Sequence, residues 1–364
     1  MINRLYAYLV KHLDRHLLTL VAILLVMGLL TLYSAAGASL ERVAAQMANI
    51  SVALVLMWIA ANVPLHYLSR IALPLYVLGL VLLIAVAAFG EIVNGARRWL
   101  DLGFTRIQPS ELMKIAVPLM LAWYFDRYEA VLKMRDFAVG ALLVLIPVLL
   151  IAQQPDLGTA LLVTAAGFFV LFLAGLSWKI LVGLTLAGGA SLPFLWSMLH
   201  DYQRQRVLTL LDPSQDPLGA GYHTIQSTIA LGSGGVFGKG WLNGTQSHLD
   251  FLPERTTDFI FAVYAEEFGL AGNLVLLVLF LLVISRGMLI TAGAPTLFAR
   301  LLAGAITLTF FTYAFVNMGM VSGVLPVVGI PLPLVSYGGT ALVSICLGFG
   351  ILMSIATHKK LVQT

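Results

Sequence analysis

A few charged residues lie inside or at the edge of long apolar runs, and they are the first candidates for chemistry. Asp258 follows two threonines and directly precedes an apolar stretch, which places it at the mouth of a membrane segment. A carboxylate there can act as a general base or bind a metal ion. Helix capping is the alternative: Thr256 or Thr257 is then the N-cap residue, and Asp258 lies in the first turn, where the helix dipole favours negative charge.

Glu111 and Lys114 form a second candidate site, because residues three apart lie on one face of a helix. In one interpretation the two charges neutralise each other so that the helix can enter the membrane. In the other, Lys114 presents its charge to an anionic ligand while Glu111 orients it. Ionisable groups in membrane segments are costly and usually functional, and both interpretations stay open. Glu266 and Glu267, deeper in the chain's eighth apolar run, are interpreted as structural partners for polar groups between helices.

The composition shows which solvent surrounds these groups. The 364 residues are 60% hydrophobic and 10% charged, whereas soluble domains carry about 25% charged residues. The apolar runs are continuous rather than alternating, so they predict spanning helices and not a membrane β-barrel. The single cysteine, Cys346, excludes an internal disulfide and a thiolate metal site. The net charge of +4 is interpreted as membrane topology, with no nucleic-acid partner.

The chain is predicted to be an all-α polytopic membrane protein with about ten transmembrane helices, forming a single domain over residues 1–364. A spanning helix needs about 20 apolar residues. The predicted spans lie near 17–36, 46–64, 71–90, 111–125, 137–152, 157–175, 180–199, 259–285, 301–320 and 337–356. The first is interpreted as an uncleaved span rather than a signal peptide, because its apolar run is too long. The uncharged stretch 301–358 exceeds one span, and its prolines and glycines predict two helices joined by a loop.

The basic residues predict the orientation. An even number of spans puts both termini on one side, and the distribution of Lys and Arg favours the cytoplasmic side. One long extracytoplasmic loop, at about 200–257, is expected to fold into short helices and turns. Basic residues on the outer side gather in this loop and in the segment 91–114. Positive charge on that side is explained by an anionic ligand.

Two proline-containing segments complete the set of candidates. Asp156 follows Gln154 and Pro155 and is interpreted as a helix cap. The segment Leu325–Thr340 contains three prolines and paired glycines at membrane depth, where irregular backbone is tolerated only if it lines a cavity or is buried in protein. Its free N–H groups are candidates for binding an anion. The histidines show no metal-ligand spacing, and those of the long loop, His223 and His248, are interpreted as surface residues.

Five segments together resemble the SEDS (shape, elongation, division and sporulation) family. They are Asn94–Leu100, Ile107–Lys114, Gln154–Ala160, Thr257–Val263 and Pro331–Thr340. They run in the family's order over nearly the whole chain. Three further stretches are similar to the elongation (RodA) type rather than the division (FtsW) type: Gly238–Leu242, Gly244–Ser247 and Asn317–Gly323.

The resemblance implies a ten-helix fold in the bacterial inner membrane and a peptidoglycan glycosyltransferase. Such an enzyme polymerises lipid II into glycan strands during elongation and releases undecaprenyl diphosphate. The implied partners are a class B penicillin-binding protein, the MreC/MreD elongation complex and membrane lipid. A divalent metal, Mg or Mn, is also implied. Asp258 matches the family's essential aspartate, and Ser336 belongs to a matching segment implied in substrate binding.

These residues suggest a mechanism. Asp258 deprotonates the acceptor sugar and is also a possible metal ligand, while Arg98, Arg97 and Lys114 hold the diphosphate. Lys239 and Arg206 are weaker candidates for the acceptor side. Because a polyprenyl tail leaves the bilayer only at high cost, the site should open sideways to lipid, in a groove beside the fourth and eighth spans. Two other functions stay open: a lipid II flippase, and a non-catalytic scaffold of the elongation complex.

Overall fold

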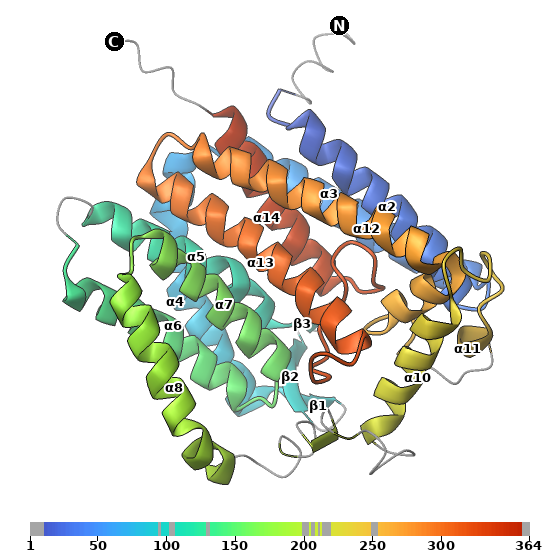
Figure 1. Ribbon diagram of the computed structural model, residues 1–364. Helices are drawn as coiled ribbons and strands as arrows, with labels where there is room; N and C mark the ends of the chain where they lie inside the picture. The colour runs from blue at the N-terminus through green and yellow to red at the C-terminus, as the bar shows by residue number, and fades with distance from the viewer. Residues whose placement is uncertain are drawn as a thin grey trace, which may run out of the picture.

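The computed structural model describes residues 11–93, 96–101, 106–128, 132–198, 204, 208–209, 212, 220–248 and 254–358. Long helices run side by side through the molecule (Figure 1). They are α2 (Arg15–Ala35), α3 (Leu40–Asn62), α4 (Leu65–Phe89), α5 (Pro109–Arg127), α6 (Met134–Ala152), α7 (Leu157–Leu173), α8 (Trp178–Met198), α12 (Ile260–Ala292), α13 (Leu297–Val321) and α14 (Thr340–Thr357). Each predicted span overlaps one of them.

Within the described residues, seven helices are long and apolar enough to cross a membrane: α2, α3, α4, α6, α12, α13 and α14. The polytopic membrane fold is therefore confirmed, while the total of ten spans stays a prediction. The described ends of the chain lie together, since the rings of His12 and His358 stack with their centroids 4.1 Å apart. That the termini face the cytoplasm stays a prediction.

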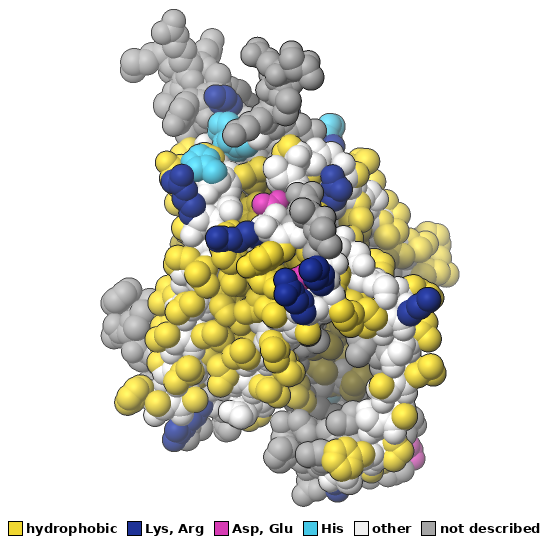
Figure 2. Space-filling model, turned by 90° about the vertical axis from the view of Figure 1, so that its left-hand side faces the viewer, with side chains coloured by type: hydrophobic (Ala, Val, Ile, Leu, Met, Phe, Trp, Pro, Cys, Tyr) yellow, Lys and Arg dark blue, Asp and Glu magenta, His cyan; other side chains and the backbone are white. Residues whose placement is uncertain are grey.

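The exterior and the interior of the bundle differ in the way a lipid solvent requires. Figure 2 shows a broad band of hydrophobic side chains on one face, with Lys, Arg and His side chains gathered mainly above it. Exposed apolar residues are the normal surface where lipid is the solvent. In the most apolar 18-residue stretch of each helix, 72% of the residues are buried in α13 but only 22% in α3. Helix α13 is thus a central helix of the bundle, against which α5, α7 and α12 pack.

A small antiparallel sheet was not predicted. It has the order β1-β2-β3 and is formed by β1 (Glu91–Val93), β2 (Ala96–Asp101) and β3 (Arg106–Ile107). Val93 pairs with Ala96, and Leu100 pairs with Ile107. Strands of two to six residues are too short to produce a clear alternation in the sequence. The sheet connects α4 to α5 and carries Arg97 and Arg98.

The described part of the long loop contains α10 (Ala220–Ser233) and the short α11 (Thr245–His248), as predicted. The same loop also hydrogen-bonds to α12 at a break in that helix.

Gly269 has φ 64° and ψ −162°, which interrupts this helix of 33 residues. The amides of Lys239 and Gly240 donate to the carbonyls of Glu266 and Glu267, at 3.0 Å each.

The repair is reciprocal. Beyond the break, the amides of Leu270 and Ala271 donate to the carbonyls of Gly235 and Val236, at 2.9 Å each. The two backbones approach so closely that a Cβ on Gly238 would lie 2.1 Å from the carbonyl oxygen of Glu267. Backbone groups freed at membrane depth need protein partners. The segment 234–240 supplies them, so α12 consists of a short part, which follows Asp258, and a longer part beyond Gly269.

Candidate active site

Asp258 lies in a turn formed by residues 254–259, not in the first turn of a helix. Helix α12 begins at Ile260, and its N-cap residue is Phe259, without a side-chain capping bond. The alternative interpretation, in which Thr256 or Thr257 caps the helix and Asp258 lies in its first turn, is therefore wrong. Their carbonyl groups bind elsewhere, and this holds the chain in a turn just before the helix. Asp258 is partly exposed.

The loop between α13 and α14 holds this turn through Ser336 and Tyr337. The Ser336 hydroxyl donates to the carbonyl of Thr257 at 2.6 Å and accepts from the amide of Leu332 at 2.8 Å. The amide of Tyr337 donates to the carbonyl of Thr256 at 2.8 Å. Ser336, predicted to bind substrate, thus connects the Asp258 turn to the proline-rich loop.

Asn317 of α13 provides a second connection. Its side-chain amide donates both to the carbonyl of Asp258, at 2.8 Å, and to the carbonyl of Ile330, at 2.7 Å. The side chain is fully buried. In the sequence, Asn317 belongs to one of the stretches that resemble the elongation type and was not predicted as a site residue. An asparagine in an apolar helix is costly unless its amide is hydrogen-bonded, and this was the available signal.

The carboxylate of Asp258 faces Gly329. A Cβ on Gly329 would lie 3.3 Å from Oδ2 of Asp258, and Gly329 has φ +71°. On the other side of the same loop, a Cβ on Gly158 of α7 would lie 2.8 Å from the carbonyl oxygen of Val328. Residues 328–330 are therefore packed between the start of α7 and the Asp258 turn.

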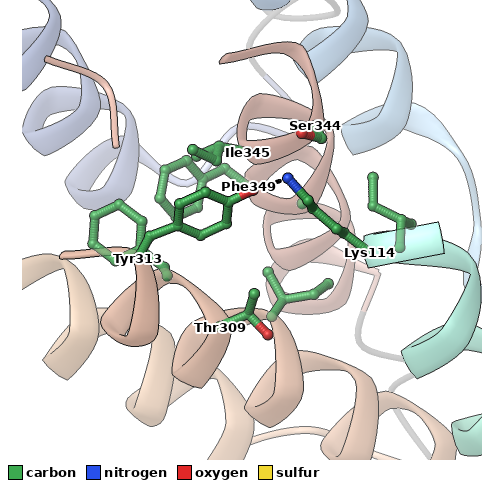
Figure 3. A pocket seen from close by; sticks show the side chains of 10 residues that line it. Lys114, Thr309, Tyr313, Ser344, Ile345 and Phe349 are labelled. Atoms are coloured by element: carbon green, nitrogen blue, oxygen red, sulfur yellow. Dashed lines mark hydrogen bonds between the residues drawn. The ribbon is translucent and has the colours of Figure 1, made fainter. Parts of the chain in front are cut away.

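Lys114 and Glu111 form the predicted ion pair, with Nζ and Oε1 2.6 Å apart. The Lys114 ammonium also donates to the Tyr313 hydroxyl at 2.6 Å, and Ser344 donates to the second Glu111 oxygen at 2.6 Å. Figure 3 shows the ammonium between Tyr313 and Ser344. It lines a cavity of about 40 Å³ between α5, α13 and α14, enough for one water molecule.

Both interpretations of this pair remain compatible with the geometry, since the charges neutralise each other and also border a cavity. A groove was predicted beside α5 and α12. In the structure, α13 packs against both of these helices. The cavity beside α5 is bounded by α13 and α14 instead.

Arg98 binds the chain near the start of α7. Its guanidinium donates to the carbonyls of Gln154, at 3.3 Å, and Pro155. Asp156 is the N-cap residue of α7, as predicted, because its carboxylate accepts from the amide of Thr159 at 3.2 Å. Its second oxygen accepts from the Gln108 side chain at 3.0 Å. Arg97, the neighbour of Arg98 on β2, is exposed.

Lys239, a weaker candidate for the acceptor side, is paired with Glu266 of α12. Its ammonium lies 2.7 Å from Oε1 of Glu266 and 2.7 Å from the Thr245 hydroxyl. Glu266 also accepts from the amides of Thr245 and Gln246, so this buried acid joins the long loop to α12. Its predicted structural role is confirmed. Arg206, the other acceptor-side candidate, lies outside the described residues.

His223 was interpreted as a surface residue, but its ring stacks on Phe259, next to Asp258, with the centroids 5.6 Å apart. Burial lowers the pKa of His223, and the nearby Glu254 opposes this shift. The ring is therefore a neutral part of the support for the Asp258 turn at physiological pH. The interpretation failed because the stacking partner is 36 residues away in the sequence.

The two ionic candidates meet through α13. Tyr313, which binds Lys114, and Asn317, which binds the Asp258 turn, are four residues apart and lie on one face of the helix. The Arg98 region reaches the same place through the contact of Gly158 with the 328–330 segment. Asp258, Lys114 and Arg98 thus belong to one connected region.

A sequence comparison decides the family. The profile of the FtsW, RodA and SpoVE family, described as cell cycle proteins, matches residues 15–361. The chain belongs to this family. Peptidoglycan glycosyltransferase MrdB of Escherichia coli K12 is 53% identical over 97% of this chain and 95% of its own length. A probable peptidoglycan glycosyltransferase FtsW of Coxiella burnetii is 39% identical over 85% of each chain.

Solved structures of family members have the same fold. A chain of a peptidoglycan synthase complex superimposes with a TM-score of 0.82 at 37% identity, covering 94% of this chain and 97% of its own. The rod shape determining protein RodA of Thermus thermophilus gives 0.71 at 31% identity, covering 94% and 96%. The family fold therefore extends over nearly the whole chain, with the Asp258 turn inside the matched region.

Proposed function

We propose that this chain is a peptidoglycan glycosyltransferase that polymerises lipid II into glycan strands and releases undecaprenyl diphosphate. The observation that carries the proposal is the Asp258 turn: a partly exposed carboxylate held by Ser336, Tyr337 and Asn317. The 53% identity to MrdB over nearly the full length supports it. The proposed location is the bacterial inner membrane, with Asp258 on the outer side.

The proposed reaction needs one base. The carboxylate of Asp258 takes the proton of the acceptor sugar hydroxyl as its oxygen attacks the anomeric carbon of the donor. The bond between that carbon and the diphosphate oxygen breaks, and the electron pair leaves with the diphosphate. Because this leaving group is stabilised directly by cations, a second carboxyl group acting as an acid is not required.

Arg97 and Arg98 are proposed to hold the diphosphate at the outer end of β2. Arg97 is exposed, and Arg98 lies beside the start of α7, which contacts the 328–330 segment. Lys114 contributes positive charge from inside the bundle, with Glu111 fixing its position at 2.6 Å. A fixed ammonium in a water-poor site stabilises negative charge more strongly than one in bulk water.

A divalent Mg or Mn ion is proposed as a cofactor, with the partly exposed carboxylate of Asp258 as its single protein ligand. Within the described residues, no group of three His, Cys, Asp or Glu side chains could hold a metal. Mg²⁺ commonly binds one or two carboxylates and completes its shell with water and substrate phosphate oxygens. Asp258 would be its protein ligand, and the ion would neutralise charge on the leaving diphosphate.

A class B penicillin-binding protein and the MreC/MreD complex are the proposed partners. The structure that matches at a TM-score of 0.82 comes from a complex that coordinates polymerisation and crosslinking. A transpeptidase bound to this chain would crosslink the strands as they form. Copurification of the full-length chain with each partner tests these assignments.

The enzymatic proposal is tested with purified full-length protein, lipid II and Mg²⁺ or Mn²⁺, scored for glycan polymer. Asp258→Asn should reduce polymerisation about 10²- to 10⁴-fold, the usual contribution of a general base. Glu41→Gln is the matched control, because Glu41 is an exposed acid in the first turn of α3. Chelation of the metal should also stop the wild-type reaction.

Three outcomes separate the alternatives. Normal polymer from Asp258→Asn removes this residue from the mechanism. Transfer of lipid II between leaflets without polymer supports a flippase. Cells that keep their rod shape with Asp258→Asn and Lys114→Met together point to a scaffold.

A further inference from the structure

A second recess lies at the end of α2 that is remote from Asp258. It is a groove of about 440 Å³ between the first turns of α2 and the last turns of α12. Its lining consists of His16, Thr19, Leu20, Leu282, Ser285, Arg286 and Leu289. Volumes of this size are typical of small-molecule sites. Nothing in the proposed polymerisation uses it.

The groove combines an apolar floor with a cationic rim. Leu282 and Leu289 are exposed along α12 on either side of Arg286, and His16 lies in the first turn of α2. Arg286 donates to both carboxylate oxygens of Asp14, with its Nε 3.0 Å from Oδ1. These bonds use two of the five N–H donors of a guanidinium. Arg286 therefore keeps donor capacity for a second anion.

The length of α2 shows how deep in the membrane the groove lies. Helix α2 has 21 residues and is thus about 32 Å long, close to the thickness of the hydrocarbon core. Its other end reaches the Asp258 region, where Arg255 donates to the carbonyl of Ala35 at 2.7 Å. The groove therefore opens at the headgroup level of the leaflet opposite to Asp258. Lys11 and Arg15 are exposed at this end.

We propose that this groove binds an anionic phospholipid of the inner leaflet. The phosphate lies against Arg286 and His16, and the exposed Ser285 hydroxyl donates to it. One acyl chain follows Leu20 and Leu282 toward the bilayer interior, while Leu289, on the other side of Arg286 along α12, borders the headgroup. The concentration of Lys, Arg and His at this level attracts acidic headgroups rather than zwitterionic ones. A shallow groove with a charged rim and an apolar base matches a lipid better than an apolar helix of a partner.

The test is a lipid titration of the full-length protein by native mass spectrometry, with phosphatidylglycerol and phosphatidylcholine as probes. The wild type should retain phosphatidylglycerol at least about tenfold more tightly, equal to 1.4 kcal/mol. Arg286→Lys combined with His16→Gln should remove most of this preference, because lysine keeps the charge opposite Asp14 but loses the second set of donors. Arg300→Gln, an exposed cation at the start of α13, is the matched control and should retain it.

Asp14→Asn gives an effect of opposite sign. Asparagine is also a good N-cap residue, so α2 keeps its start. Without the carboxylate, the charge of Arg286 is no longer neutralised by a neighbour, and phosphatidylglycerol should bind several-fold more tightly. If Asp14 had a purely structural role, Asp14→Asn would bind phosphatidylglycerol more weakly or not at all. Leu289→Trp, which fills the groove without changing charge, should reduce lipid retention, and thermal unfolding confirms that each variant is folded.

Three results would overturn the proposal. The first is equal retention of the two lipids by the wild type. The second is binding of glycerol phosphate alone as tightly as the whole lipid. The third is a dimer of this chain that disappears with Leu289→Trp while lipid retention is unchanged.

Discussion

Two acid–lysine pairs of this protein differ in what surrounds them. Glu266 is fully buried, and its carboxylate accepts bonds from Lys239, from the Thr245 hydroxyl and from two backbone amides. Every one of these donors belongs to the long loop. Within the part of the chain that the structure describes, the Glu111–Lys114 pair is bonded only to side chains, Tyr313 and Ser344, and its ammonium borders a cavity.

The difference separates a structural pair from a pair available for chemistry. Bonds to backbone amides fix one chain segment to another, and they hold the carboxylate in one position. Side-chain bonds around a cavity can be exchanged for bonds to a ligand. The Glu266 pair thus holds the chain that leads to Asp258, whereas the Lys114 pair places an ammonium beside a cavity, in the position proposed for contact with substrate.

Methionine substitutions of the two lysines give the largest expected effects. Lys239→Met leaves a fully buried carboxylate unpaired and should lower stability by about 3–5 kcal/mol. Lys114→Met should lose less stability, because Glu111 keeps Ser344 and is 13% exposed, but polymerisation should fall at least about 100-fold. Thermal unfolding and polymer formation are measured for both. Equal losses in both assays would erase the distinction between the pairs.

Asn317→Asp tests the connection between the two regions. The substitution removes both N–H donors and places a charge against two carbonyl oxygens now at 2.8 and 2.7 Å. We expect a loss of about 2–4 kcal/mol, since two buried acceptors lose their partner. In protein that remains folded, kcat should fall more than KM rises. Thr307 is also buried on α13 and donates to the carbonyl of Ala303 in the same helix. Thr307→Val should leave stability, kcat and KM unchanged. Similar losses in this variant would show that any polar change in α13 has the same effect.

Gly329→Ala tests how tightly the carboxylate is enclosed. A residue other than glycine at φ +71° costs about 1–2 kcal/mol, and the added Cβ lies 3.3 Å from Oδ2 of Asp258. Gly37→Ala is the control: its φ is +64°, and among the described residues a Cβ there would meet no atom within 4 Å. Both variants should lose similar stability, but polymer should decrease only with Gly329→Ala. The same activity in both would show that Gly329 does not set the position of Asp258.

A third ion pair, Asp14 with Arg286, should have the smallest effect, because Arg286 is partly exposed. Burial alone would raise the pKa of Asp14, but hydrogen bonds from Arg286 and from the amide of Leu17 lower it overall. A lowered pKa means stability that is present above about pH 4, the pKa of an unfolded aspartate, and is lost as pH falls through the folded value. Asp14→Asn should be less stable than wild type by up to about 1 kcal/mol at pH 7, and the difference should vanish at low pH. A difference that persists at pH 2 would assign the effect to packing.

The helices were predictable because lipid imposes a simple rule on the sequence. Long uncharged runs, interrupted by glycine and proline, located each of the long helices and the division between α13 and α14. Asp258, Glu111 and Lys114 were also recognisable, since charge is costly beside such runs. These signals are local, and a single sequence contains them directly.

The features that the sequence did not predict depend on contacts between segments far apart in the chain. The break at Gly269 is hidden in an apolar pattern that continues on both sides, and the backbone bonds that repair it come from residues 235–240. The alternative in which Thr256 or Thr257 caps α12 failed because the carbonyl groups of both residues bind the loop after α13. Asn317 acts on a turn 59 residues earlier in the chain. No spacing rule reveals these pairings.

The interruption of α12 has a consequence for engineering. Loops outside a membrane ordinarily accept insertions and tags. Here, residues 234–240 hydrogen-bond to α12 across its break, and the short part of α12 that they hold begins directly after the turn that carries Asp258. Lengthening this stretch by even one residue should shift the register of that joint and displace the acid, so a tag placed between Gly234 and Gly240 should be as damaging as one inside a transmembrane helix.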